Sequence, residues 1–69
     1  MTPIVDTLEP LIDKHGMVHV LAGLALICFE KAEHLRSNWQ DDNSAKVWDR
    51  AGRAIDRFAT HAAITTLES

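Results

Sequence analysis

Apolar residues recur every three and four positions through the middle of this chain. Seven consecutive members of this pattern are Val18, Leu21, Ala25, Cys28, Ala32, Leu35 and Trp39. Because an α-helix returns to one side with this period, the pattern predicts a long helix at about residues 17–40. A second stripe of the same kind predicts another helix at about residues 43–65, and its members are Trp48, Ala51, Ile55, Phe58 and Ala62. Strand-like alternation is absent from the sequence, so the predicted fold class is all-α.

Two helices of matched length with a short polar link between them favour an antiparallel helical hairpin. If Trp39 and Trp48 pack together across the turn, the numbers of facing residues sum to 87, and Ala32 faces Ile55. We expect the polar side chains of residues 41–44 to cap the last helix.

Gly52 lies inside the last predicted helix, where glycine costs about 1 kcal/mol relative to alanine. The expected pairing gives it a packing role, because Arg36 would lie over it while Phe29 meets Ala59. We therefore interpret Gly52 as a residue that is present for packing.

The N-terminal segment is predicted to form a short third helix at about residues 3–15. Pro3 is typical of a first helical position, and Gly16 follows a basic last turn that is typical of a helix end. Pro10 is expected to kink this helix because it lacks a backbone donor. Residues 1–69 then form a single helical domain.

The predicted hairpin has more apolar surface than one short helix can cover. We expect the first helix to cover the flank formed by Met17, Val20, Leu24 and Ile27. The other flank would stay exposed, and its members are Ala22, Leu26, Phe29, Ala59 and Ala63. Exposed apolar patches usually mark interfaces, and a symmetric dimer is the commonest arrangement. The sequence therefore predicts a homodimer that completes a helical bundle through this candidate interface.

A second candidate surface combines aromatic and basic side chains near the turn and along the last helix. Its members are Trp39, Trp48, Arg36, Arg50, Arg53 and Arg57. The leading interpretation is a small, non-catalytic, oligomeric module that binds or regulates another protein in an unknown pathway. The arginine stripe leaves a nucleic-acid-associated regulator as the alternative, although a net charge of −3 disfavours that partner.

Catalytic chemistry has little support in the sequence. Cys28 lies in the apolar stripe without a histidine on the same face, so it lacks a base to activate it. Glu30 and His34 share a helix face, but zinc needs at least three protein ligands. A metal-dependent activity that borrows a ligand from a partner chain is the third hypothesis. We expect no enzyme activity, no cofactor and no metal.

The longest apolar run covers residues 17–29, which is 13 residues and is interrupted by His19. A membrane-spanning helix needs about 20 apolar residues, so we expect no membrane insertion. One cysteine fits a reducing compartment, and a cytoplasmic location is the expectation.

Overall fold

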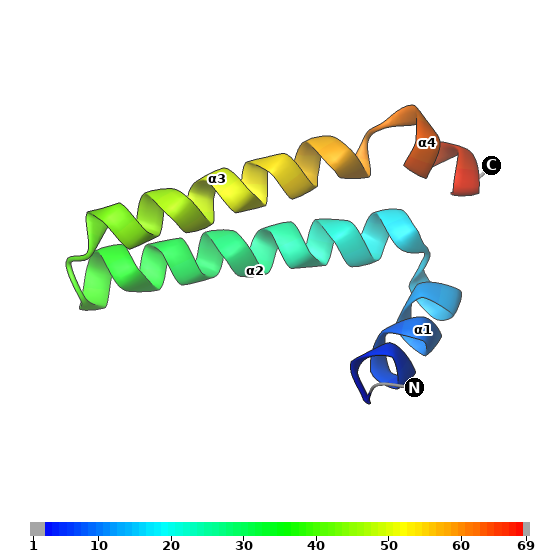
Figure 1. The fold of residues 1–69 in the computed structure, drawn as a ribbon, viewed down its shortest axis with the longest axis horizontal. Helices are drawn as coiled ribbons and strands as arrows, with labels where there is room; N and C mark the ends of the chain where they lie inside the picture. The colour runs from blue at the N-terminus through cyan, green and yellow to red at the C-terminus, as the bar shows by residue number, and fades with distance from the viewer. Residues whose placement is uncertain (1–2, 69) are drawn as a thin grey trace.

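The structure is a computed structural model that describes residues 3–68. It contains four α-helices and a terminal 3-10 helix (Figure 1): α1 (Pro3–His15), α2 (Met17–Asn38), α3 (Asp42–Ala59), α4 (Ala62–Thr65) and η1 (Thr66–Glu68). The described residues contain no strand. The all-α prediction is confirmed, and the two long helices pack against each other as an antiparallel hairpin.

The molecule is long and thin, with extents of 41 × 28 × 17 Å. Its radius of gyration is 14.0 Å, against about 11 Å expected for a compact chain of this length. Figure 1 shows why: α2 and α3 lie side by side, while α1 projects away from the pair. A shape of this kind leaves few positions that are enclosed on all sides.

The turn between α2 and α3 consists of residues 39–41. Trp39 ends α2 with its backbone N–H on the Leu35 carbonyl at 3.2 Å, and the N–H of Asp41 reaches the same carbonyl at 3.0 Å. Gln40 takes the left-handed conformation that lets the chain reverse (φ 50°). Asp41 caps α3, since its carboxylate accepts the N–H of Ser44 at 3.1 Å. The predicted cap within residues 41–44 is therefore supplied by Asp41.

This short turn sets the register of the hairpin. Because α2 ends at residue 38 and α3 begins at residue 42, the numbers of facing residues sum to about 80 rather than 87. Phe29 accordingly packs on Gly52, where an added Cβ would lie 2.6 Å from the ring. The predicted roles of Arg36 above Gly52 and of Ala59 opposite Phe29 are therefore wrong, while Gly52 does have a packing role, with Phe29 as its partner.

The predicted pairing of Trp39 with Trp48 is also wrong. Trp39 is 70% exposed, and Trp48 instead lies beside Lys31, whose Nζ is 5.7 Å from the ring centroid. At a sum near 80, Ile55 is level with residue 25 and not with Ala32. The error arose because the two tryptophans were placed symmetrically about the turn, whereas capping by Asp41 starts α3 earlier.

Small residues form the contact between the two long helices. The buried positions of α2 and α3 are Ala25, Cys28, Ala32, Ala45, Gly52 and Ala59. Side chains this small let the two backbones approach closely. The larger stripe predicted to line the core of α3 is rotated outward, with Trp48 37% exposed and Phe58 50% exposed.

The end of α3 differs from the expected span. The helix predicted over residues 43–65 stops at Ala59, and α4 starts at Ala62 in a new direction (Figure 1). The Thr60 hydroxyl donates a hydrogen bond to the Arg57 carbonyl at 3.0 Å, and the His61 ring accepts one from the Ala63 N–H at 3.0 Å. These side chains satisfy backbone groups locally, which favours helix ends over helix interiors.

The first helix runs from Pro3 to His15 and includes Pro10, and the chain changes direction at Gly16, which has a φ of 89°. The angle between α1 and α2 is 119°. None of the described helices is long and apolar enough to span a membrane alone. The bent pair α1 and α2 meets that test together, on length and composition only.

Candidate functional site

The chain exposes an unusual amount of surface for its size. Its accessible area is 5306 Å², whereas a compact monomer of 7.7 kDa is expected to expose about 4,300 Å². The excess of roughly 1,000 Å² is comparable to the 800 Å² or so that each partner contributes to a standard protein interface. Among the described residues, no large side chain is fully buried. The chain therefore exposes additional surface of the extent that a protein partner covers.

One side of the hairpin carries a continuous set of apolar side chains that we call the apolar face. Its members are Leu24, Ile27, Trp48, Ala51, Ile55 and Phe58. The last four share one side of α3 by helical spacing, next to the buried alanine and glycine positions. Leu24 is 40% exposed and Ile27 is 48% exposed, so α1 leaves these two members of the expected flank uncovered, whereas Met17 and Val20 are half-buried.

A shallow groove of about 550 Å³ lies at the turn end of the apolar face. Its lining residues are Ile27, Glu30, Lys31, His34, Leu35 and Trp48. The ammonium group of Lys31 lies over the Trp48 ring, 5.7 Å from its centroid, so the two side chains form a cation–π contact in the groove. Apolar side chains with a charged rim are typical of a contact surface for another protein.

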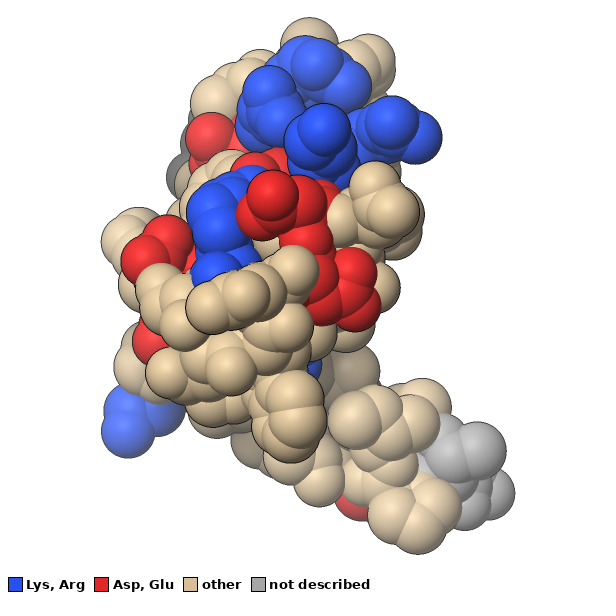
Figure 2. Space-filling view, turned by 90° about the vertical axis from the view of Figure 1, so that its left-hand side faces the viewer, with Lys and Arg blue, Asp and Glu red and all other residues tan. Residues whose placement is uncertain are grey.

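The opposite flank of α3 carries a basic strip, formed by Lys46, Arg50, Arg53 and Arg57. These exposed side chains surround a hollow of about 450 Å³. Figure 2 shows the basic side chains gathered over the upper part of the molecule, where α3 lies. Arg53 donates from Nε to the Asp49 carbonyl at 3.4 Å, and no carboxylate among residues 3–68 forms an ion pair with any of the four.

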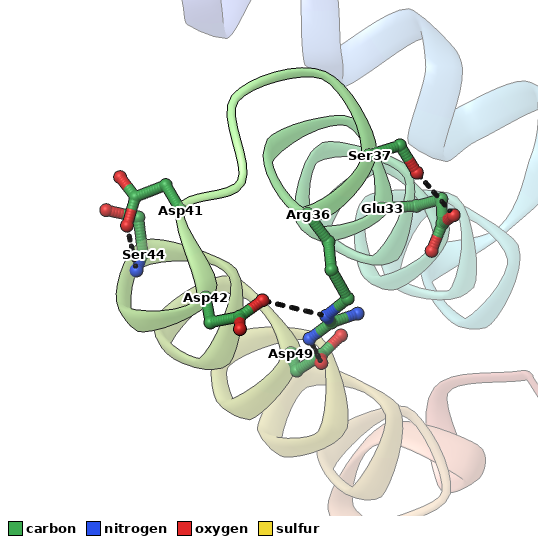
Figure 3. A network of polar contacts seen from close by, with 7 residues as sticks. All are labelled: Glu33, Arg36, Ser37, Asp41, Asp42, Ser44 and Asp49. Atoms are coloured by element: carbon green, nitrogen blue, oxygen red, sulfur yellow. Dashed lines mark hydrogen bonds and ion pairs between the residues drawn. The ribbon is translucent and has the colours of Figure 1, made fainter.

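Arg36 does not belong to this strip, although the sequence placed it there. It reaches from α2 to α3, with Nη2 2.8 Å from the Asp49 carboxylate and Nε 3.9 Å from that of Asp42 (Figure 3). The hydrogen bond to Asp49 is the main cause that raises the pKa of Arg36 above its usual value. Its role in this chain is to join the two helices near the turn.

A stripe of opposite charge lies on α1. Asp6, Glu9 and Asp13 are all exposed and follow one side of the helix with steps of three and four residues. The sequence interpretation gave them no binding role. Their spacing was the signal that was available.

The predicted interface residues fall into two groups. Ala59 is only 3% exposed and Phe29 packs on Gly52, so both are used inside the chain. Ala22, Leu26 and Ala63 are exposed, with Leu26 at 59%.

The candidate partner surface is likewise divided. Trp39 is at the turn, and its indole donates to His34 Nε2 at 3.3 Å. Trp48 lies in the groove, and Arg50, Arg53 and Arg57 lie on the opposite flank of α3. The structure therefore separates aromatic and basic residues that the sequence had grouped together.

The residues that the sequence offered for catalysis or metal binding were Cys28, Glu30 and His34. No group of three or more potential metal ligands occurs among residues 3–68. Cys28 is buried in the seam at 7% exposure, where a thiol is inert. Both ring nitrogens of His34 have neighbours, because Asn38 Nδ2 lies 2.7 Å from Nδ1 and Trp39 contacts Nε2.

Comparison with known protein families, curated proteins and solved structures found no match to this chain.

Proposed function

We propose that this chain is a non-catalytic interaction module that associates with a second copy of itself through the apolar face. The observation that carries the proposal is the exposure of Leu24, Ile27, Trp48 and Phe58 in a molecule with few large buried side chains. Exposed apolar patches of this kind mark interfaces in soluble proteins.

The free energy available from burying the apolar face is of the order needed for two copies to associate. Completing the burial of a half-exposed Leu, Ile or Phe contributes about 1 kcal/mol, which is roughly half of the value for full burial. Four such side chains on each of two copies contribute about 8 kcal/mol, since a symmetric interface uses every residue twice. This lies within the estimated association cost of about 4–15 kcal/mol, so a reversible dimer is expected rather than a permanent one.

A second candidate function is contact with nucleic acid through the basic strip. The strip favours it because four cations follow one helix over about 17 Å. The overall charge of −3 opposes the approach of a polyanion, so protein association is preferred.

Adjacent residues of α2 provide a matched test of the interface. Ile27 lines the groove with Trp48, whereas Leu26 points about 100° away and belongs to the flank first predicted from the sequence. Ile27→Glu and Leu26→Glu place the same charge one residue apart, at positions 48% and 59% exposed. Sedimentation equilibrium with circular dichroism reports mass and helix content together.

We expect Ile27→Glu to be a folded monomer and Leu26→Glu to remain a dimer. A dimer that survives Ile27→Glu but not Leu26→Glu would move the interface to the flank with Ala22 and Ala63. If both variants keep the dimer, neither surface forms it.

A further inference from the structure

The first helix makes few contacts with the rest of a single chain. Helix α1 has 13 residues and none is buried, with Ile4 60%, Val5 42% and Leu11 41% exposed. Isolated helices of this length are marginal in water. Among the described residues α1 packs against α2 and does not reach α3. An apolar side of α1 is thus open to a partner.

The charges on α1 and α3 have the same spacing and opposite signs. Asp6, Glu9 and Asp13 are separated by three and four residues, and Arg50, Arg53 and Arg57 repeat these steps in the same order. Two parallel helices with this pattern bring each carboxylate level with one guanidinium.

The order of the faces around each helix supports the same orientation. Successive residues turn by about 100°, clockwise when an α-helix is viewed from its N-terminus. The acidic stripe therefore lies clockwise of the apolar side of α1, which is centred on Leu8. The basic strip lies anticlockwise of the apolar side of α3, which is centred near Ala51 and Phe58. When two parallel helices meet so that Ile12 of α1 lies against Val47 and Phe58 of α3, both charged stripes lie about 90–100° from the line of contact and on the same edge, where long side chains can meet.

We propose that α1 of one copy docks parallel to α3 of a second copy, with the acidic stripe against Arg50, Arg53 and Arg57. This inference rests on the proposed self-association and specifies its register. The apolar side of α1 covers Phe58 and Val47, which are 50% and 61% exposed. Two-fold symmetry repeats the contact, so each copy gives and receives one α1 helix.

Charge reversal separates this arrangement from a dimer held by apolar contacts alone. The acid-reversed variant carries Asp6→Lys, Glu9→Lys and Asp13→Lys, and its net charge changes from −3 to +3. Net repulsion between copies is therefore equal in magnitude to that of the wild type. The six-fold variant adds Arg50→Glu, Arg53→Glu and Arg57→Glu, which returns the net charge to −3 and restores opposite charges across the contact.

We expect the dissociation constant of the acid-reversed variant, measured by sedimentation at low salt, to rise at least about tenfold. The six-fold variant should return to within about threefold of the wild type, and the differences should shrink in 1 M salt. An acid-reversed variant that dimerises like the wild type would overturn the inference and leave self-association intact. A six-fold variant as weak as the acid-reversed one would also overturn it. A wild-type chain that stays monomeric would instead contradict the proposed self-association itself.

Binding of a labelled DNA duplex tests whether nucleic acid, instead of α1 of a second copy, occupies the basic strip. We expect no binding by the wild-type dimer at concentrations where it is fully associated, because α1 of the partner covers the arginines. Duplex binding by the dimer that is lost on Arg50→Glu, Arg53→Glu and Arg57→Glu would show that the strip is free for a polyanion and would contradict the docking.

Discussion

Replacing Gly52 by alanine tests the contact that sets the hairpin register. A Cβ at this position would lie 2.6 Å from Cε1 of Phe29 and 3.0 Å from both Cδ1 and Cζ. Real Cβ atoms do not approach so closely, so the ring must move away from α3. Gly23 on α2 is the control, because an added Cβ there meets nothing within 4 Å.

Two opposing free-energy terms decide whether Gly52→Ala stabilises or destabilises the chain. Alanine is favoured over glycine inside a helix by about 1 kcal/mol. Displacing a packed ring typically costs about 1–3 kcal/mol. We therefore expect Gly52→Ala to change the free energy of unfolding by between about zero and 2 kcal/mol in the destabilising direction. Gly23→Ala carries only the propensity term and should stabilise by about 1 kcal/mol.

Urea denaturation followed by circular dichroism, at one fixed protein concentration, measures both variants. The double variant Phe29→Ala with Gly52→Ala completes the cycle. Without the ring, alanine at position 52 should stabilise by about 1 kcal/mol relative to Phe29→Ala alone. If Gly52→Ala stabilises the wild-type chain as much as Gly23→Ala does, Phe29 does not lie on Gly52 and the register is wrong.

Other consequences of the structure can be measured separately. Asp41→Ala should lower the thermal midpoint by about 4–8 °C through loss of the cap. The hydrogen bonds from Ser44 lower the pKa of Asp41 below its ordinary value of 3.8. The carboxylate therefore contributes its full stabilisation above pH 3.8, and this stabilisation is lost as the pH falls further. A difference in thermal midpoint between wild type and Asp41→Ala that stays constant below that pH would contradict this. In Trp48→Phe, the remaining Trp39, 70% exposed, should be quenched by acrylamide more strongly than Trp48 is in Trp39→Phe, and equal quenching would argue against the two environments. Cys28 should react with a thiol reagent slowly in buffer and rapidly in urea, whereas fast labelling in buffer would place it outside the seam.

The sequence pattern was sufficient for the helices but not for their relative rotation. The period of three and four residues predicted α2 and α3, and Gly16 correctly marked the end of α1. Both a large stripe and a small stripe run along α3 with the same period. The large stripe, with Trp48 and Phe58, was chosen as the core because burial of large side chains is favourable. The structure places the small stripe, with Gly52 and Ala59, between the helices.

The candidate surfaces followed from that choice. If the large stripe forms the core, the flank with Leu26 is left as the predicted interface and α1 is expected to cover the flank with Ile27. A single sequence does not distinguish a core within one chain from a core shared by two copies, because both bury the same kinds of residue. The arginine stripe lies on a single helix, so its prediction did not depend on how the two helices are aligned, and the structure places it on α3 as expected. Arg36 is the exception, because it forms an ion pair with Asp49.

The mass of the wild-type chain across a dilution series tests self-association most directly. Sedimentation equilibrium, with circular dichroism at each concentration, should give a mass approaching twice the 7.7 kDa of one chain and falling reversibly on dilution. Helix content should fall with the mass, because α1 loses its partner. A mass of 7.7 kDa at every concentration, with helix content unchanged, would contradict the account.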